Sequence, residues 1–261
     1  MKLGLIGCGN IGEFLLKAIN KDGLLPEGKI NSVFSRREEV AVKVAQKFNA
    51  KTYGDIDSFL NSDIDVVIEV ATIEAAQEYA LKVLESRKDL ILSSIGVLAD
   101  EGFLEDVQEI CRKNNVTASV PSGAIGGLDI LKSAKSMDGL DAVSLTTRKP
   151  PTALPDNQTL RGEKVLFEGL ASEAIKKFPR NINVAIVLSL AGLGPDRTSV
   201  KIIADPNISK NMHLIEAAGS FGTLKLEVEN NPMPDNPKTS FLAALSVLAT
   251  LQNKEHVVQV G

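Results

Sequence analysis

The chain has 261 residues, of which 44% are hydrophobic and 24% are charged, and its formal net charge at pH 7 is -4. These proportions are typical of a globular protein and exclude an extensively disordered or membrane-embedded chain. The length favours two domains, and the slightly acidic balance argues against a nucleic acid or an anionic membrane as a partner. We therefore expect a small-molecule partner.

The two cysteines, Cys8 and Cys111, are far apart and lack CxxC or Cys/His spacing. This pattern predicts neither a disulfide framework nor a metal site, and it favours a reducing compartment. The apolar start of the chain is broken by Gly4 and Gly7, so it is too short for a secretory signal or a membrane span. We expect a cytoplasmic protein.

Short apolar runs alternate with helical periodicity along the first 121 residues. The expected strands are 3–6, 30–34, 66–70, 90–93 and 116–120, and the expected helices are 13–19, 37–48, 75–86 and 101–114. This βαβ alternation predicts a doubly wound parallel sheet, an α/β fold of the Rossmann type. We assign residues 1–121 to this dinucleotide-binding domain.

The pattern changes after Pro121. A glycine-rich loop opens a helix near residue 128, and strands are expected at 142–147, 198–204, 214–218 and 223–228. Residues 122–236 are therefore assigned to a second, α+β domain with a mainly antiparallel sheet, for substrate, catalysis and dimerisation. A last helix is expected at 238–251, after a run of helix-breaking residues, and the segment 237–261 is expected to pack back on the first domain.

A G-x-G-x-x-G motif follows the first strand and precedes the first helix. In such a motif Gly7 permits a tight turn, Gly9 lets the backbone approach a pyrophosphate, and Gly12 lets helix and strand pack closely. Asn10 and Ile11 lie between these glycines and precede the helix, whose free N–H groups suit phosphates. The alternative is a glycine turn in an α/β domain that binds no cofactor.

The second strand is followed by Ser35, Arg36 and Arg37. An acidic residue at this point would bind the ribose 2'-hydroxyl of NAD, whereas a hydroxyl and two guanidinium groups suit the 2'-phosphate of NADP. We therefore expect use of NADP, or of both NADP and NAD. The alternative is that the two arginines only begin a solvated helix.

The chain has two histidines, so the search for an imidazole acid or base is short. His256 lies in a polar tail. His213 lies inside the second domain, just before an expected apolar strand, and is the catalytic candidate. A lone histidine of this kind can equally be structural.

Four separated motifs make the chain similar to a known family. They are Ser122-Gly123-Ala124-Ile125-Gly126-Gly127-Leu128-Asp129, Phe178-Pro179-Arg180-Asn181-Ile182-Asn183-Val184-Ala185, Ala204-Asp205-Pro206 with Asn211-Met212-His213, and Asn236-Pro237-Lys238-Thr239-Ser240. Together they resemble the L-aspartate dehydrogenase family, nearly from end to end. Many members carry Asp where Ser35 stands here, which puts strict NAD specificity in doubt.

The resemblance implies reversible oxidative deamination of L-aspartate to oxaloacetate and ammonia through iminoaspartate, which would also feed NAD biosynthesis. It implies that His213 is the active-site histidine and that Ala124 and Asn183 contact the nicotinamide cofactor. One imidazole near Cα could take a proton from the amine and later activate the water that hydrolyses the imine.

The two substrate carboxylates need cationic or N–H partners. We expect these from Lys238, Thr239 and Ser240 at the start of the last helix, and from Asn211, which would share a face with His213 if this segment is extended. The alternative for the first three residues is a structural helix cap.

Two other interpretations stay open at this stage. The chain could be a different two-domain reductase, of the dihydrodipicolinate or homoserine type, or a regulatory NAD(P)-binding protein without turnover. A homodimer is expected, because a domain with an open sheet face often forms a two-fold interface.

Overall fold

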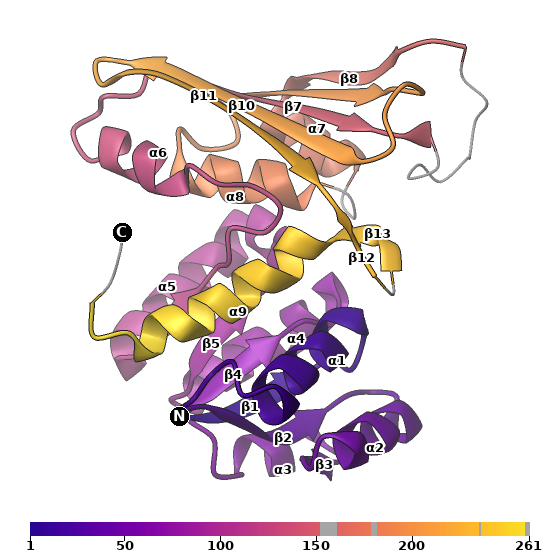
Figure 1. Cartoon of the computed structure of the whole chain (residues 1–261). Helices are drawn as coiled ribbons and strands as arrows, with labels where there is room; N and C mark the ends of the chain where they lie inside the picture. The colour runs from indigo at the N-terminus through magenta and orange to yellow at the C-terminus, as the bar shows by residue number, and fades with distance from the viewer. Residues whose placement is uncertain (152–160, 179–181, 235, 259–261) are drawn as a thin grey trace. The chain divides into compact units, whose positions relative to one another are not determined.

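We describe a computed structural model of the chain that covers residues 1–151, 161–178, 182–234 and 236–258, without the side chains of Pro237 and Lys238. Contacts between Cα atoms divide it into two compact units. The first comprises residues 1–121 and 246–260, and the second comprises residues 122–245. Each unit has its own sheet (Figure 1).

The first unit is built on a parallel sheet with strand order β3-β2-β1-β4-β5-β6 in its described residues. Its strands are β1 (Lys2–Ile6), β2 (Lys29–Phe34), β3 (Lys51–Tyr53), β4 (Val66–Glu69), β5 (Asp89–Leu92) and β6 (Ala118–Ser119). Its helices are α1 (Asn10–Leu16) with the π-helical turn η1 (Lys17–Lys21), α2 (Glu38–Lys47), α3 (Ile56–Leu60), α4 (Ile73–Glu85), the 3-10 turn η2 (Ile95–Ala99) and α5 (Glu101–Asn114). The expected doubly wound parallel sheet is confirmed.

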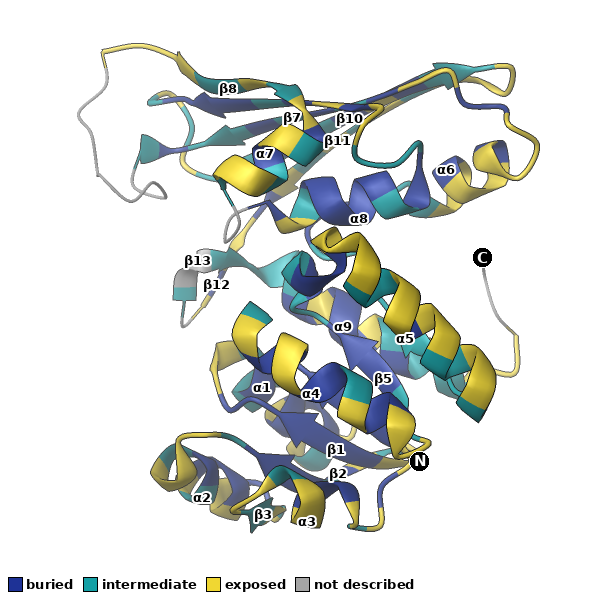
Figure 2. Ribbon diagram, turned by 180° about the vertical axis from the view of Figure 1, so that it is seen from behind, coloured by how far each residue is buried: buried dark blue, intermediate teal, exposed yellow. Residues whose placement is uncertain are grey.

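Both faces of this sheet are apolar, as expected for a parallel sheet covered by helices on each side. Leu3 and Leu5 of β1 point into one core, with Leu15 of α1 and Val44 of α2. On the other face Phe34 packs edge-on against Tyr79 of α4. Figure 2 shows the resulting burial of β1 and β5.

The second unit has a mixed sheet with strand order β11-β10-β7-β9-β8 in its described residues. Only the β7–β9 pair is parallel, and the other pairs are antiparallel, in agreement with the α+β expectation. Its strands are β7 (Ala142–Lys149), β8 (Lys164–Leu170), β9 (Thr198–Ala204), β10 (Asn211–Gly219) and β11 (Gly222–Asn230). Its helices are α6 (Leu128–Lys135), α7 (Ala171–Lys177) and α8 (Asn183–Ala191).

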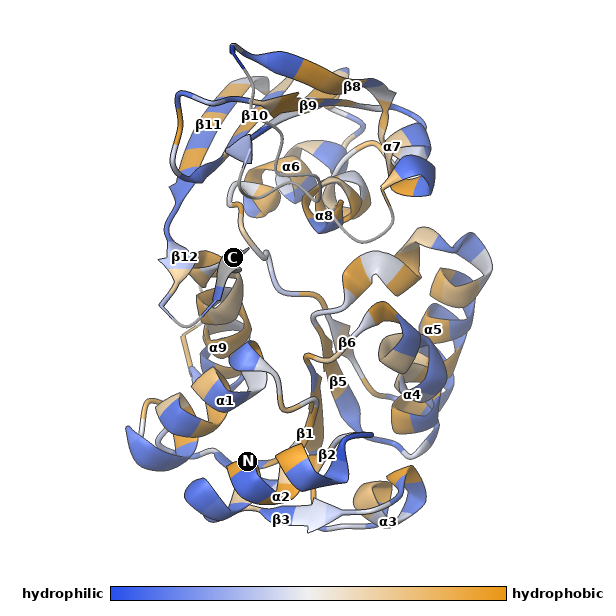
Figure 3. Cartoon of the chain, turned by 90° about the vertical axis from the view of Figure 1, so that its right-hand side faces the viewer, coloured by the Kyte–Doolittle hydropathy of each residue, from blue (hydrophilic) through white to orange (hydrophobic). Residues whose placement is uncertain are grey.

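All three helices of the second unit lie on one face of its sheet (Figure 1). Hydrophobic and polar residues alternate along the strands, visibly so in β11 (Figure 3). The inner, helix-covered face therefore carries the buried alternate residues, such as Leu145 of β7 and Ile215 of β10. The opposite face carries partly exposed polar residues, including ion-paired Lys201 and Glu168.

The expected helix start at Lys238 is wrong. Residues Asn236–Ser240 form strand β13, which pairs antiparallel with β12 (Pro232–Met233), and helix α9 spans Phe241–Glu255. The local ladder, together with a hydrogen bond from the Phe241 N–H to the Asn231 carbonyl oxygen, holds this segment extended. From Ser246 onward α9 belongs to the first unit, where Val247, Leu248 and Leu251 join the core that contains Leu3.

Candidate active site

The glycine turn after β1 has the packing that a dinucleotide fingerprint requires. Gly7 has a φ of +106°, and its N–H donates to the Phe34 carbonyl oxygen over 2.9 Å. A Cβ at Gly7 would lie 2.9 Å from Ala71, and a Cβ at Gly12 would collide with the Gly7 carbonyl oxygen. A Cβ at Gly9, in contrast, would meet no atom within 4 Å. The turn is thus tight at its first and third glycines and open at its second, where a pyrophosphate must approach.

Helix α1 starts directly at this turn. Gly9 is the N-cap residue and provides no side-chain cap, so the N–H groups of the first helical turn keep their capacity to bind an anion. Asn10 is exposed and Ile11 is partly exposed at this helix start. The residues present therefore fit the diphosphate of a nicotinamide dinucleotide.

The three residues after β2 lie beside the same turn. The Phe34 carbonyl oxygen that accepts from Gly7 immediately precedes Ser35, whose Oγ accepts the Arg37 N–H over 3.4 Å. Arg36 and Arg37 are exposed. Arg37 is also close enough to act electrostatically on Cys8 inside the turn, although burial is the larger effect and raises the pKa of the Cys8 thiol to about 11. Both guanidinium groups are available to an anionic ligand.

Glu69, at the end of β4, connects two loops at the carboxyl edge of the first sheet. Its carboxylate accepts from the N–H groups of Ala71 and Ser94 and from the Ser94 hydroxyl, over 2.7 to 3.0 Å. Burial raises the pKa of Glu69, while these donors oppose the rise. Because Ala71 occupies the space that a Cβ of residue 7 would need, Glu69 fixes the backbone beside the glycine turn.

His213 lies inside strand β10, not before a strand as the sequence suggested, and its side chain is 5% exposed. It is directly opposite Thr147 of β7 in the antiparallel register. The Thr147 Oγ1 and His213 Nδ1 atoms form a 3.0 Å hydrogen bond in which either can donate. The imidazole is therefore held in one orientation by a buried hydroxyl.

A row of polar side chains crosses the inner sheet face next to His213. Asn211 of β10 is paired with Asn230 of β11, and continuing the β7–β10 register by one residue places Lys149 beside Asn211. These three residues share the face of His213. Asn211 is two residues from His213 along β10, and Lys149 and Asn230 are each two residues from the residue that is paired with His213 on their own strand. We call Lys149, Asn211 and Asn230 the polar row.

The polar row contains unsatisfied groups. The side-chain oxygens of Asn211 and Asn230 are buried without a hydrogen-bond partner. The Asn230 amide donates to the Ala124 carbonyl oxygen over 3.1 Å, which ties the glycine-rich loop to the row. Within the described residues Lys149 has no ion pair or hydrogen bond, whereas Arg148, its neighbour on the opposite face, pairs with Glu163 and Asp205 over 2.7 and 2.9 Å.

Burial on this face lowers the pKa of its basic side chains, so they lose their proton more easily than in water. Burial, with a further contribution from the positive charge of Lys149, lowers the pKa of His213 to about 4. Burial also lowers the pKa of Lys149. His213 is consequently a neutral imidazole at physiological pH, in the form that a general base needs.

Sequence reasoning missed Thr147, Lys149 and Asn230. Strand β7 was expected, but which of its residues lie against His213 depends on register between strands far apart in the chain. Because alternate residues of a strand share a face, the sequence does indicate that Thr147 and Lys149 point the same way. It does not indicate that this face contains His213.

Other predicted residues are less closely connected with His213. Ala124 is buried and bound to Asn230, as described above. Asn183 is the exposed first residue of α8, and the described part of the chain shows no hydrogen bond between it and the polar row. Thr239 accepts from the Asn236 side chain over 2.9 Å, and Ser240 pairs with Pro232, two residues beyond Asn230. The Lys238 side chain lies outside the described residues.

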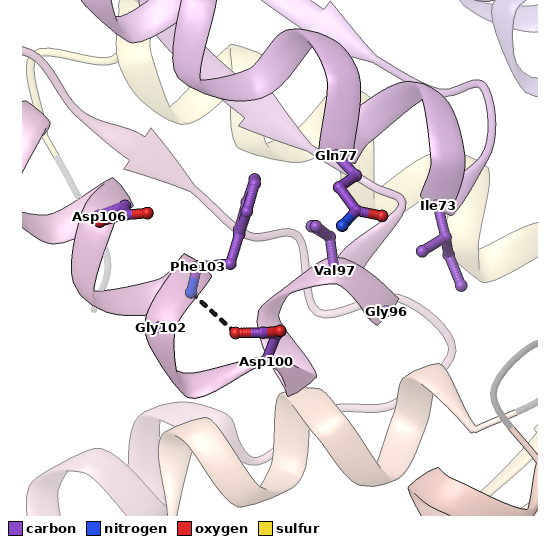
Figure 4. Close-up of a pocket in the computed structure, with 8 residues that line it drawn as sticks. All are labelled: Ile73, Gln77, Gly96, Val97, Asp100, Gly102, Phe103 and Asp106. Carbon is purple, nitrogen blue, oxygen red and sulfur yellow. Dashed lines mark hydrogen bonds between the residues drawn. The ribbon is translucent and has the colours of Figure 1, made fainter.

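A surface pocket of about 480 Å³ lies between α4, η2 and α5 (Figure 4). It is lined by Gln77, Asp100, Phe103 and Asp106, among others, and holds none of the predicted site residues. Asp100 is used as the N-cap of α5 through the Phe103 N–H. The pocket is therefore not formed by the predicted site residues.

The described residues lack both a metal-binding cluster and a membrane-spanning helix. No three His, Cys, Asp or Glu side chains are grouped so that they could hold a metal ion. No helix there is both long and apolar enough to cross a membrane.

Comparison with known proteins identifies the family. Residues 129–254 match the model described as aspartate dehydrogenase, C-terminal, and residues 7–121 match that of the homoserine dehydrogenase NAD-binding domain. An L-aspartate dehydrogenase of Methanosarcina barkeri is 40% identical over 100% of this chain and 99% of its own length. The chain belongs to the L-aspartate dehydrogenase family. It is accordingly an oxidoreductase that uses a nicotinamide cofactor.

Other L-aspartate dehydrogenases support this placement. The protein of Nitrosopumilus maritimus is 39% identical, with 96% of this chain and 95% of that protein covered. The crystal structure of aspartate dehydrogenase from Thermotoga maritima has a TM-score of 0.81 and 32% identity, and covers 100% of this chain and 99% of its own. The similarity therefore spans both units.

Proposed function

We propose that this protein catalyses the reversible oxidative deamination of L-aspartate to oxaloacetate and ammonia through iminoaspartate. The observation that carries the proposal is the neutral, buried His213 in a chain of this family, oriented by Thr147 and next to Lys149, which has no ion-pair partner among the described residues. We assign substrate binding and catalysis to the second unit and binding of the cofactor diphosphate to the first.

The roles of the residues follow from the chemistry of the substrate. A bound nicotinamide supplies the hydride acceptor for Cα–H cleavage. Cleavage requires a neutral amine, and His213 can take its proton when Nδ1–H donates to Thr147 and Nε2 is the free base. Once this first proton has been released to solvent, the same nitrogen can remove a proton from the water that adds to the imine carbon, and return it to the substrate nitrogen as ammonia leaves.

We propose NADP as the preferred cofactor, with NAD as a second substrate. Ser35, Arg36 and Arg37 support this, because they follow β2 next to the glycine turn and include no carboxylate to repel a 2'-phosphate. Of the remaining cofactor residues, we assign the diphosphate to Gly7, Gly9, Asn10, Ile11 and Gly12. Ala124 and Asn183 are proposed to contact the nicotinamide half.

Three further properties stay predictions. They are a homodimer formed through the open sheet face of the second unit, a cytoplasmic location, and use of iminoaspartate in NAD biosynthesis. Size-exclusion chromatography with light scattering would measure the first. A monomer at micromolar concentration would contradict it.

The test of function follows oxidation of NADPH, and separately of NADH, with oxaloacetate and ammonium. The controls are pyruvate and 2-oxoglutarate as alternative keto acids, and aspartate semialdehyde as the substrate of a homoserine-type reductase. Oxidation that needs both oxaloacetate and ammonium supports the proposal. Cofactor binding without turnover of any of these compounds would instead favour a regulatory protein.

A further inference from the structure

We propose that the Lys149 ammonium group binds a carboxylate of the substrate beside His213, which makes it a substrate-binding residue. The proposal rests on the function proposed above, and it adds a residue that the sequence motifs did not include. It is argued from the placement of Lys149 on the sheet, from its surroundings and from the unsatisfied atoms next to it.

The strand geometry directs Lys149 to the same face as the base. Thr147 is opposite His213 in the register of β7 and β10, and Lys149 follows Thr147 by two residues. Alternate residues of a strand share a face, so Lys149 and His213 belong to adjacent rows of the inner face. The positive charge of Lys149 also acts electrostatically on His213 and helps to lower its pKa.

The charge of Lys149 lacks a counter-ion in the described residues, although other cations of this sheet have one. Arg148 pairs with Glu163 and Asp205, and Lys201 of β9 pairs with Glu168 over 2.9 Å. These pairs lie on the opposite face. A largely desolvated ammonium without a partner is unfavourable, and an anionic ligand would remove that penalty.

The neighbouring atoms indicate the chemical class of this anion. The side-chain oxygens of Asn211 and Asn230 are buried, accept no hydrogen bond and belong to the same polar row. The row therefore offers one cationic donor and two neutral acceptors. A ligand that carries both a carboxylate and an N–H group satisfies all three, and an amino or imino acid has this combination.

The experiment compares Lys149→Met with Lys149→Arg, and with Lys201→Met as the matched control on the outer face. In Lys149→Met we expect the KM for oxaloacetate, at saturating ammonium and NADPH, to rise about 10- to 100-fold, because a charged hydrogen bond is lost. The Kd of NADPH should stay within about twofold of the wild-type value. Lys149→Arg should recover part of the loss, and Lys201→Met should behave as wild type.

A binding measurement separates this proposal from the proposed function. Calorimetric titration of the NADPH-saturated protein with succinate, a dicarboxylate that cannot react, should show binding that Lys149→Met weakens by a similar factor. If the wild type turns over no oxaloacetate but Lys149 still governs succinate binding, the proposed function fails and the carboxylate site stands. An unchanged KM and unchanged succinate binding in a folded Lys149→Met protein would overturn the site. So would a loss of thermal stability in Lys149→Met with no change in ligand affinity.

Discussion

Thr147 Oγ1 lies 3.0 Å from Nδ1 of His213, across two strands that pair in antiparallel register although they are 66 residues apart in the chain. Both side chains are buried. This hydrogen bond engages Nδ1 and leaves Nε2 for the substrate, and Nε2 is a base in the tautomer in which Nδ1–H donates to Thr147. Replacing either partner tests a different part of the proposed mechanism.

Replacing His213 with Asn should lower kcat for oxaloacetate amination by about 10²- to 10⁴-fold, the usual contribution of a general acid or base. The affinity for NADPH should remain, because the glycine turn belongs to the first unit. Steady-state kinetics and fluorescence titration of NADPH measure the two effects. His256→Asn is the matched control. Wild-type turnover in His213→Asn would remove this residue from the mechanism.

Replacing Thr147 with Val should lower kcat about tenfold and leave KM nearly unchanged, because one neutral orienting hydrogen bond is lost. Thr147→Ser keeps the hydroxyl and should restore most of the activity. Thr146→Val changes the neighbouring residue, which points to the opposite face, and should have little effect. Equal losses in Thr147→Val and Thr147→Ser would point to packing instead of the hydroxyl.

His213 should make the stability of the fold depend on pH. Its pKa is about 4 in the folded protein against an ordinary value of 6.5. Between these values the unfolded chain binds a proton that the native state does not, so stability falls as the pH is lowered from 6.5 to 4 and this loss ends below 4.

The full effect of His213 is on the order of 3 kcal/mol in the free energy of unfolding. Urea denaturation at several pH values should therefore show a steeper acid loss in wild type than in His213→Asn. Parallel pH profiles of the two proteins would mean that the pKa of His213 is not lowered.

The glycines of the turn should respond differently to alanine. At Gly9 a Cβ meets open space and the backbone φ is -79°, so Gly9→Ala should fold normally but bind NADPH more weakly, because the methyl group obstructs the pyrophosphate. At Gly12 a Cβ collides with the Gly7 carbonyl oxygen, so Gly12→Ala should lose about 1–3 kcal/mol of stability. Thermal melting with and without NADPH distinguishes the two. Full NADPH affinity in Gly9→Ala would place the diphosphate elsewhere.

The double change Ser35→Asp with Arg36→Gln should move cofactor preference from NADPH toward NADH. The new carboxylate can bind a ribose 2'-hydroxyl and repels a 2'-phosphate. The ratio of kcat/KM for the two cofactors is the measurement, and Lys43→Gln, which removes an exposed charge from nearby α2, is the control. An unchanged ratio would mean that these side chains do not meet the ribose.

Much of the first unit was predictable because its signals are local. The strand, glycine turn and helix of residues 2–16 are consecutive in the chain, so spacing and residue type were enough to predict them. The short elements β3, α3 and η2 escaped prediction, since three to five residues give too little periodicity. Helix α8 was not predicted either, because it is apolar on nearly all sides and shows no helical stripe.

At the C-terminal end, local signals were misleading. Residues 238–240 follow a run of helix-breaking residues and precede a true helix, which is why the sequence predicts them to be the helix start. Pairing of β13 with β12 makes them a strand instead, so Thr239 and Ser240 precede the first turn of α9 and do not form it. Ladder hydrogen bonds with residues earlier in the chain override the propensity of a short segment.

The sequence by itself determined the Rossmann topology, the glycine turn and, through motifs held in order, the family, and it singled out His213 as the catalytic candidate. Only the tertiary structure decided what surrounds that histidine. Thr147, Lys149 and Asn230 come from two other strands, and their position next to His213 depends on register, where a slip of one residue would turn each of them to the opposite face. The lowered pKa of His213 is likewise a property of burial and of the Lys149 charge, which arise only when the strands have paired.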